Sequence, residues 1–422
     1  MSPSGEPLIS VEICAGAGGQ AIGLHGADFR HVGLVEIDTH AVGTLKANIR
    51  ERKEWGWERD FCDVIAGDVK HFKPLEDLVK VKGFLGRSLR RGELHLLAGG
   101  VPCPPFSHAG KQLGKDDERD LFPEVLRLVD ELLPKAVMIE NVRGIKDAKF
   151  DEYRRWIEDQ LSEVGKNESG EGPGYEVVEW DVLEASDFGV PQLRPRAILV
   201  AFRRDILGDL TFVKPKATRQ TCKTVWEALR PSMRDRYGKY LDGDRAEDAL
   251  SAYRRWYEKA RGRAKAKPDG SSGVAPTLVG GSKKHGGADL GPSRAKAAWR
   301  SLGVNGLGVA NDHDTGVKRG SQDRDLFGGD GPMLTVEQAA IIQGFPDDWH
   351  FAGLKTAQYR QVGNAFPPPV AEAVGKEIAK VLRAARERDQ APDSVAGDGS
   401  VVAIPAASAG ADRSRDLQSA SV

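Results

Sequence analysis

Short apolar runs alternate with helical patterns through the N-terminal half of this 422-residue chain. Four of these runs, each followed by a turn with Gly or an acidic residue and then by helical spacing, lie at 8–13, 31–37, 94–98 and 136–139. Chains in which strands and helices alternate form parallel sheets with helices on both faces. We therefore expect an α/β fold built on a doubly wound, mostly parallel sheet.

A longer pair of extended patterns follows at 175–182 and 196–202, with a polar turn between them. The pair predicts a hairpin added to the sheet. From 206 to 332, Lys, Arg and Gly are frequent and long apolar runs are rare, which predicts a second, smaller and irregular domain. Helical spacing returns at 334–345 and 371–385.

These changes in texture divide the chain. We expect a first domain at 1–205, completed by a C-terminal helix at 357–387. The region 206–332 is the second domain, and 333–356 bridges the two. Ala, Ser, Gly and Asp dominate the last segment, 388–422, which is therefore expected to be a disordered tail.

The overall composition, with 40% hydrophobic and 29% charged residues, is ordinary for a globular protein. A formal net charge of −1 does not indicate nucleic-acid binding, although phosphate binding depends on a local basic face. One such stretch contains Arg254, Arg255, Lys259, Arg261, Arg263, Lys265 and Lys267. Read alone, a charge run is more often a solvated helix face than a binding site.

Other features exclude several classes of protein. No apolar run approaches the roughly 20 residues that cross a bilayer. The first residues lack the basic start and apolar block of a secretory signal. The four cysteines show neither a CxxC pair nor the spacing of zinc ligands. We expect a cytoplasmic protein with no metal and no membrane contact.

The first candidate site is a glycine turn directly after the first apolar run, Glu12-Ile-Cys14-Ala15-Gly16-Ala-Gly18-Gly19. Glycines let the backbone approach a ligand closely at the carboxyl edge of a sheet. Glu36 ends the next run and can accept both hydroxyls of a ribose. Asp68 ends a third run and can pair with an adenine amino group. The dinucleotide spacing GxGxxG is absent, which argues against NAD and favours another adenosine-containing ligand.

The second candidate is Cys103, within Pro102-Cys103-Pro104-Pro105 directly after another run. A lone cysteine is usually a small buried hydrophobe. Here prolines restrict the backbone around a thiol at the edge where ligands bind, which favours a nucleophile. His108 lies close in sequence, but a Cys–His hydrolase also needs an orienting group that we cannot place.

Two polar segments complete the set. Glu140 and Asn141 close another strand, where a carboxyl group is usually solvated or caps a helix but can also be partly buried and donate a proton. In the segment 191–196, alternate residues share a face. Gln192, Arg194 and Arg196 therefore form either a salt-bridged strand or a set of donors for a base carbonyl and its phosphates.

In this order the segments resemble the DNA cytosine-5 methyltransferase family, of the bacterial modification methylase type. The resemblance runs from Val11 to about Phe202 and resumes at 334–346 and 359–366. It implies a Rossmann-like fold that binds S-adenosylmethionine. It also implies that the region 206–332 is a target-recognition domain, in which Ala275-Pro-Thr277-Leu278 resembles a segment that contacts the target.

The resemblance implies chemistry on a cytosine rotated out of double-stranded DNA. Cys103 adds to ring carbon 6, and carbon 5 then takes the methyl group. Glu140 neutralises charge at N3, Asn141 positions the loop of that glutamate, and Arg194 and Arg196 bind near the base O2 and the flanking phosphate. The residues implied for the methyl donor are Cys14, Ala15, Gly16, Gly18, Gly19, Glu36, Asp68, Asn364 and Ala365.

Two positions depart from the family pattern. Cys14 stands where an aromatic residue usually precedes the Ala-Gly pair, so stacking on the adenine side is weaker or falls to another residue. Pro104 stands where glutamine most often follows the nucleophile. We expect this second departure to change loop contacts and not the chemistry of the thiol.

Three alternatives stay open. A tRNA cytosine methyltransferase uses the same framework, although the basic, glycine-rich region 206–332 favours a reader of DNA. Methylation of an exocyclic amino group needs an oxygen acceptor where Cys103 stands. An inactive DNA-binding relative has no need of Cys103 and its polar partners. We expect a monomer, with a cognate restriction endonuclease as a candidate partner.

Overall fold

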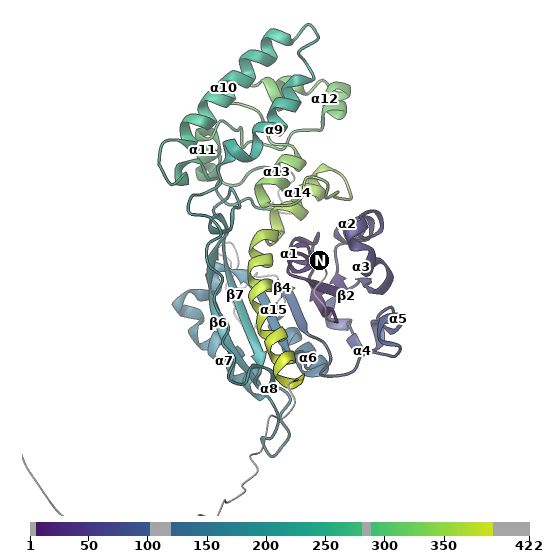
Figure 1. The fold of residues 1–422 in the computed structure, drawn as a ribbon. Helices are drawn as coiled ribbons and strands as arrows, with labels where there is room; N and C mark the ends of the chain where they lie inside the picture. Colours follow the sequence, from purple (N-terminus) through teal and green to yellow (C-terminus); the bar gives the residue numbers. More distant parts are fainter. Residues whose placement is uncertain (1–5, 102–119, 281–287, 391–422) are drawn as a thin grey trace, which may run out of the picture.

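The computed structural model describes residues 6–101, 120–280 and 288–390. Seven strands form one sheet in the order β3-β2-β1-β4-β5-β7-β6 (Figure 1). The first five strands are parallel, whereas β7 is antiparallel to both β5 and β6. The strands are β1 Leu8–Ile13, β2 Phe29–Glu36, β3 Asp63–Ala66, β4 Leu96–Gly100, β5 Ala136–Val142, β6 Tyr175–Glu184 and β7 Pro195–Arg203. The predicted mostly parallel sheet and its added hairpin are confirmed.

The strand order reverses between β1 and β4, where Ile13 lies beside Gly99 in the parallel register. At such a switch point the connections that follow the two strands leave the sheet in opposite directions. They open a crevice at the carboxyl edge of the sheet, where doubly wound folds bind ligands. The glycine turn follows β1, and the segment that leads to Cys103 follows β4. The topology therefore brings the beginnings of two predicted sites to one crevice.

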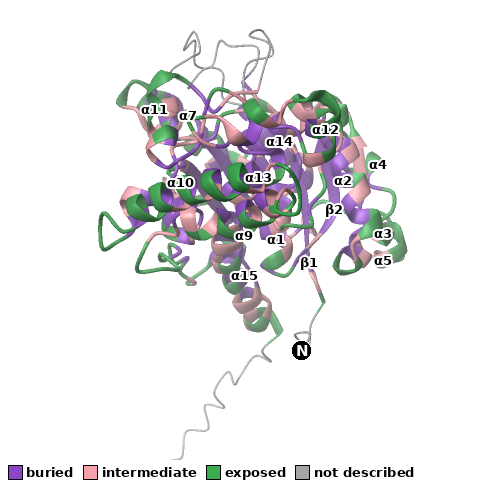
Figure 2. Cartoon of the chain, turned by 90° about the horizontal axis from the view of Figure 1, so that it is seen from above, coloured by how far each residue is buried: buried purple, intermediate pink, exposed green. Residues whose placement is uncertain are grey.

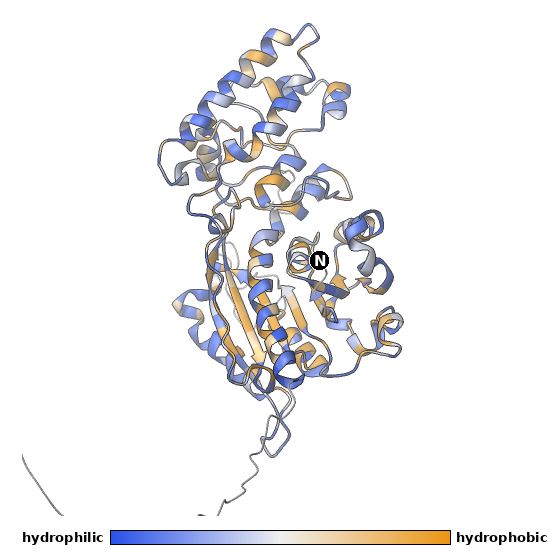
Figure 3. Cartoon of the chain, in the orientation of Figure 1, coloured by the Kyte–Doolittle hydropathy of each residue, from blue (hydrophilic) through white to orange (hydrophobic). Residues whose placement is uncertain are grey.

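Helices cover both faces of the sheet. One face packs against α1 Gly19–Gly26 and α15 Pro368–Gln390, and the other against α6 Phe122–Leu132 and α7 Asp151–Glu163. The strands are the most continuously apolar elements, while α15 alternates between apolar and polar residues (Figure 3). Gly23 permits the close contact of α1 with α15, because a Cβ there would lie 2.5 Å from Ala371 Cβ.

The C-terminal segment forms two helices, which corrects the single helix expected at 357–387. They are α14 Lys355–Asn364 and α15, which starts at Pro368. Pro367, Pro368 and Pro369 have no amide N–H, so the carbonyls four residues earlier, of Gly363, Asn364 and Ala365, lose their helical donors. The helix must stop, and those carbonyls need other partners.

The region 206–332, which was expected to be irregular, contains helices joined by irregular segments. Its helices are α9 Val225–Gly238, α10 Ala246–Ala264, α11 Ser293–Ser301 and α12 His313–Arg319, which gather at one end of the molecule (Figure 1). The buried face of α10 is mostly alanine around Trp256, so its helical period shows poorly in counts of large apolar residues. The predicted basic stretch occupies its exposed side and continues beyond its end.

The buried residues of these helices continue without a break into the rest of the protein. One apolar cluster joins Trp256 and Trp299 to Leu334, Trp349 and Trp55. The helices α13 and α14 contribute buried residues to this cluster, which are coloured purple in the view from above (Figure 2). The predicted division into domains stays a prediction. The remaining α-helices are α2 Thr39–Glu51, α3 Gly56–Phe61, α4 Pro74–Asp77, α5 Lys82–Leu85, α8 Arg204–Leu207 and α13 Val336–Gln343.

Within the described residues, no helix combines the length and the apolar character needed to cross a membrane. Most of the expected tail 388–422 lies outside the described residues, and Arg388, Asp389 and Gln390 belong to the end of α15.

Candidate active site

The glycine turn after β1 is braced by Glu36 from the end of β2. Gly16 N–H donates to Glu36 Oε2 at 2.8 Å, and Asp38 N–H donates to Oε1 at 2.7 Å. Cys14, Gly16 and Gly18 all have positive φ, at 51°, 54° and 89°. Glycine adopts this conformation without strain, whereas Cys14 carries a Cβ in a region that few L-residues occupy. The turn is thus tightly bent, and its conformation is tied to the carboxylate predicted to bind ribose.

The C-terminal segments close on the same turn. A Cβ on Gly19 would collide with the carbonyl oxygen of Phe366 and lie 3.1 Å from Ala365 Cβ. Trp349 donates its indole N–H to Ala17 O at 2.9 Å, and its ring would lie 2.9 Å from a Cβ on Gly18. Packing therefore requires glycine at both positions, and at Gly18 the backbone angle requires it as well.

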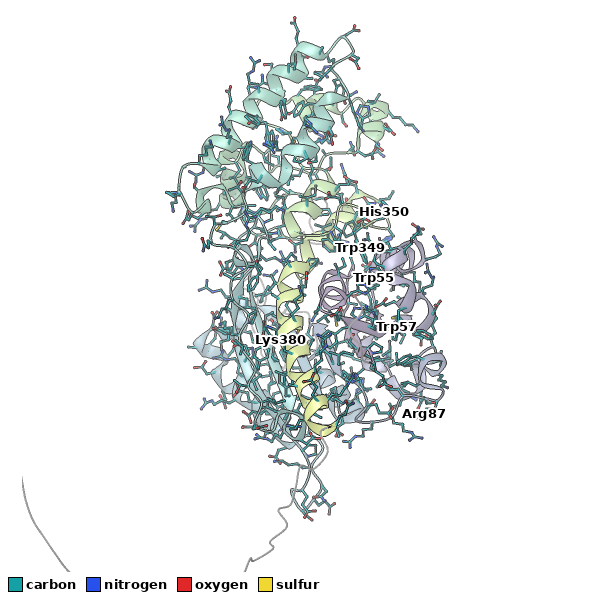
Figure 4. The ribbon with its side chains drawn as sticks, in the orientation of Figure 1. Trp55, Trp57, Arg87, Trp349, His350 and Lys380 are labelled. Carbon is teal, nitrogen blue, oxygen red and sulfur yellow. The ribbon has the colours of Figure 1, made fainter. Side chains whose placement is uncertain are left out.

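Trp349 is itself held on its other sides. The Arg52 guanidinium lies 5.5 Å from its ring centroid and pairs with Asp348 at 2.6 Å. Trp55 lies 5.5 Å away, centroid to centroid, and the two indoles lie next to each other beside α1 (Figure 4). Sequence reasoning missed Trp349, although it follows a quoted motif by only three residues. Its aromatic ring packs directly against the glycine turn at Ala17 and Gly18.

Asp68 and Ala365 lie beside this turn, whereas the side chain of Asn364 lies against Gly280. Burial, followed by the charges of Glu36 and Asp68, raises the pKa of the Cys14 thiol, so these groups are neighbours. The Asp68 carboxylate also accepts the Lys70 N–H at 3.0 Å. Ala365 is buried, and Asn364 is exposed at the end of α14.

Three further residues at this edge were missed. Ile37 follows Glu36 and is 67% exposed, so it offers an apolar surface beside the predicted ribose carboxylate. Glu12 and Gln20 are buried, yet Glu12 Oε2 and both polar atoms of Gln20 have no hydrogen-bond partner. Buried polar atoms without partners are rare in proteins. An exposed apolar side chain, a carboxylate and unused polar atoms fit a ligand with a base, a ribose and a charged tail.

Glu140 and Arg196 meet at the carboxyl edge of β5. Arg196 Nε lies 2.7 Å from Glu140 Oε1, and each side chain is 12% exposed. Gly100 pairs with Glu140 in the sheet, and a Cβ on Gly100 would lie 3.2 Å from Glu140 Oε2. Glycine therefore leaves room for the carboxylate.

Burial raises the pKa of Glu140, and the charges of Arg196 and Arg194 lower it by less. The group is therefore poised to hold or share a proton at a higher pH than an ordinary carboxyl group. Asn141 is buried behind it, with its Oδ1 accepting the Val142 N–H at 2.8 Å.

Arg194 lies close to this pair but is only 1% exposed. Its guanidinium donates to Leu278 O at 2.7 Å, Gly363 O at 2.8 Å and Ala365 O at 2.9 Å. It thus supplies donors to two of the three carbonyls that the proline run deprives. In this arrangement Arg194 contacts protein carbonyls, while Arg196 contacts Glu140.

Gln192 extends the same network. Its Oε1 accepts the Leu278 N–H at 2.7 Å, and its amide donates to Gln343 Oε1 at 2.7 Å. Backbone bonds join Leu193 N–H to Ala275 O at 2.8 Å and Ala275 N–H to Pro191 O at 3.0 Å. The segment predicted to contact the target is therefore paired directly with the segment 191–194.

Cys103 and Pro104 lie outside the described residues. Among the residues that the structure does describe, no group of His, Cys, Asp and Glu side chains is arranged to hold a metal ion.

A doubly wound sheet with a glycine turn and a strand-end acid at its switch point defines a Rossmann-like methyltransferase fold. A solved structure described as a DNA modification methyltransferase encoded within an Escherichia coli prophage shares this fold. Its TM-score is 0.51 at 22% identity, and the match covers 89% of this chain and 99% of that chain.

The chain belongs to the C-5 cytosine-specific DNA methylase family, whose model matches residues 8–380. It is 44% identical to the type II methyltransferase M.NaeI of Lentzea aerocolonigenes over 92% of this chain and 79% of the relative. It is 42% identical to the type II methyltransferase M.NgoMIV of Neisseria gonorrhoeae over 89% and 98%, respectively. The resemblance read from the motifs is confirmed: the protein is a DNA cytosine-5 methyltransferase, of a family whose methyl donor is S-adenosylmethionine.

Proposed function

We propose that this enzyme methylates carbon 5 of a cytosine rotated out of duplex DNA, through a covalent bond between Cys103 and ring carbon 6. The observation that carries the proposal is the pair of Glu140 and Arg196 beside Gly100. Cys103 follows Gly100 by three residues, so the chain allows at most roughly 11 Å between their Cα atoms. A thiol within this reach of a proton-holding acid is what addition to a pyrimidine requires.

The residues act on the base in sequence. The Cys103 thiolate forms a bond to C6, and the electrons of the C5–C6 double bond shift into the ring toward N3. Glu140, protonated, donates to N3 and neutralises the charge that develops there, while Arg196 donates to O2. C5 then forms a bond to the methyl carbon as the bond from that carbon to sulfur breaks. As the C4–N3 double bond forms again, N3 returns its proton to Glu140. Removal of the C5 proton by a base then restores the C5–C6 double bond and expels the thiolate.

The glycine-turn side of the crevice binds the methyl donor in this proposal. S-adenosylmethionine supplies an electrophilic methyl group on a sulfonium. Glu36 accepts the ribose hydroxyls, Asp68 the adenine amino group, and Ile37 packs against the adenine. Asn364 and Ala365 close the site from the C-terminal side, together with the turn residues Cys14, Ala15, Gly16, Gly18 and Gly19. Ile37 is the residue that compensates for the missing aromatic ring at position 14.

Trapping on DNA that contains 5-fluorocytosine tests the proposal. Fluorine at C5 cannot leave as a proton does, so the wild type should form a stable covalent complex in the presence of S-adenosylmethionine. Cys103→Ala should give neither complex nor product. Glu140→Gln should slow turnover about a hundredfold, which corresponds to about 3 kcal/mol of lost charge stabilisation. Methylation of C5 by Cys103→Ala, or full turnover by Glu140→Gln, would contradict the assignment.

The biological setting is part of the proposal. The names of the two type II relatives support a restriction–modification methylase that acts on a specific duplex site, and they favour DNA over a tRNA acceptor. A cognate endonuclease, a monomeric state and a cytoplasmic location stay predictions. Bisulfite sequencing of DNA from cells that express the protein would reveal the site, and absence of any methylated cytosine would support an inactive relative.

A further inference from the structure

Arg360 on α14 is a cation without a partner in the part of the chain that the structure describes. Its Nε is buried and has no hydrogen-bond acceptor, and no carboxylate of the described residues pairs with its guanidinium. The neighbouring cation Lys355 differs, since its Nζ donates to Val309 O and Asn311 Oδ1, both at 2.9 Å. An arginine presents five donors in a rigid fork suited to oxyanions. A buried donor left unused in the free protein points to an acceptor that arrives with a ligand.

The position of Arg360 identifies the direction from which that ligand comes. Thr356, Arg360 and Asn364 are spaced four residues apart and form the more exposed side of α14. That end of α14 lies against Gly280: a Cβ on Gly280 would lie 2.7 Å from Asn364 Cγ and 3.0 Å from Arg360 O. A Cβ on Gly363 would in turn lie 2.6 Å from Gly280 Cα. The end of the segment 275–280 thus runs directly beside Arg360.

The same segment is joined to the catalytic edge of the sheet. Arg194 holds both Leu278 O and Gly363 O, and its charge reaches Glu140. In the view from above, α14 lies between α11 of the recognition region and α2 beside the glycine turn (Figure 2). A nucleic-acid strand that brings its cytosine to Glu140 and also contacts the segment 275–280 would carry its sugar-phosphate chain past Arg360.

We propose that Arg360 binds a phosphodiester oxygen of the target DNA strand next to the rotated cytosine. This inference rests on the proposed function and adds a DNA-contacting residue to it. The carboxylate of the methyl donor is the competing oxyanion, because Asn364 lies one turn further along the helix. The phosphodiester fits better, because Arg360 lies beside Gly280 at the end of the segment 275–280. The glycine turn, where the methyl donor is proposed to bind, contacts Ala365 and Phe366 instead.

The salt dependence of DNA binding tests the proposal. A fluorescent duplex that carries a site methylated by the wild type, read from bisulfite sequencing, is titrated with wild type and Arg360→Gln between 50 and 200 mM salt. Each neutralised phosphate contributes about 0.9 to the slope of log K against log salt concentration. The magnitude of the slope should therefore be smaller by about 0.9 for Arg360→Gln than for the wild type. The ratio of the two binding constants should accordingly shrink roughly threefold between the lowest and the highest salt concentration.

Two matched variants and one second ligand make the test decisive. Arg360→Lys keeps the charge and should retain most of the slope. Arg383→Gln removes an arginine charge on α15, where Arg383 pairs with Asp28 at 3.1 Å, and should leave the slope unchanged. Calorimetric binding of S-adenosylmethionine should be unaffected by Arg360→Gln, and so should the thermal midpoint.

An unchanged salt slope for Arg360→Gln would overturn the proposal, and so would a loss confined to binding of S-adenosylmethionine. If the wild type left DNA unmethylated, the proposed function would fail and this inference with it. If the wild type methylates DNA and only the slope is unaffected, this inference alone fails.

Discussion

Replacement of Arg194 by methionine should lower the free energy of unfolding, because the guanidinium joins distant parts of the chain. Its hydrogen bonds reach Leu278 O, Gly363 O and Ala365 O. Ala365 O keeps a second donor in the amide of Gln343, but the other two carbonyls have no other donor among the described residues. Methionine fills a similar volume and donates nothing.

The expected loss follows from these two carbonyls. Each buried acceptor left unpaired costs about 1–3 kcal/mol, which gives about 4 kcal/mol for the two. Burial lowers the pKa of Arg194, which shows that the charged guanidinium is itself poorly solvated. Removal of that charge offsets part of the loss. We expect the free energy of unfolding to fall by about 3 kcal/mol, a large share of the 5–15 kcal/mol typical of a folded domain.

Urea unfolding followed by tryptophan fluorescence measures this loss, since the midpoint moves at constant m-value when stability alone changes. Arg194→Lys should recover about half of it, because an ammonium reaches fewer of the three carbonyls. Arg204→Met is the control: Arg204 is half-exposed and lies 3.5 Å from Glu176, so it should cost less than about 1 kcal/mol. If Arg194→Met unfolded within about 1 kcal/mol of the wild type but lost DNA binding, the reasoning would be refuted and the DNA contact implied by the sequence favoured.

Three further changes separate packing, support and protonation. Trp349→Phe removes the N–H bond to Ala17 O and the part of the indole that lies against Gly18, so the KM for S-adenosylmethionine should rise at least about fivefold, as expected for a loss of about 1 kcal/mol or more, while kcat changes little; steady-state kinetics with an equal effect on both constants would contradict this. Gly23→Ala should lower the free energy of unfolding by about 1–3 kcal/mol through collision with Ala371 and Glu372, whereas Gly26→Ala meets only the flexible end of Glu372 and should change it by less than about 1 kcal/mol. Burial raises the pKa of Glu140 in the folded chain, so its stabilising contribution is present below the ordinary glutamate pKa of about 4.3 and is lost as pH rises through the folded value. Urea titrations between about pH 4 and pH 7 should therefore show Glu140→Gln gaining stability relative to the wild type, and a constant difference would exclude the shift.

The sequence predicted the sheet and its edge because local patterns determine both. The first strand begins and ends where its apolar run does. Glu36 ends its strand, Asp68 follows its strand by two residues and Glu140 lies two residues before the end of its strand, so parallel topology gathers all three near one edge. The helices of the region 206–332 were missed, since α10 buries mainly alanine around a single tryptophan. A pattern of small residues leaves the local signal weak, although packing makes the helix stable.

The contacts that hold the site together could not be predicted, because each joins positions far apart in the chain. Arg194 and Gly363 are separated by 169 residues, and Trp349 and Ala17 by 332. The alternation of Gln192, Arg194 and Arg196 predicted a shared set of polar side chains, but it did not show that each of the three would contact a protein group. Only the tertiary structure shows that Arg196 remains for the carboxylate.

The proline run at 367–369 explains why these distant groups need one another. Three consecutive residues without N–H end α14 and leave Gly363 O and Ala365 O without helical donors. Arg194 and Gln343 supply them, and through the same guanidinium Leu278 is attached to the edge that carries Glu140 and Arg196. The break between α14 and α15 brings Ala365 onto the glycine turn. It also leaves the carbonyls of Gly363 and Ala365 free to bind Arg194, which in turn holds Leu278 in the segment that ends at Gly280. The segments 191–196, 275–280 and 363–365 share the buried guanidinium of Arg194. A substitution in any one of them should therefore change the structure or stability of the other two.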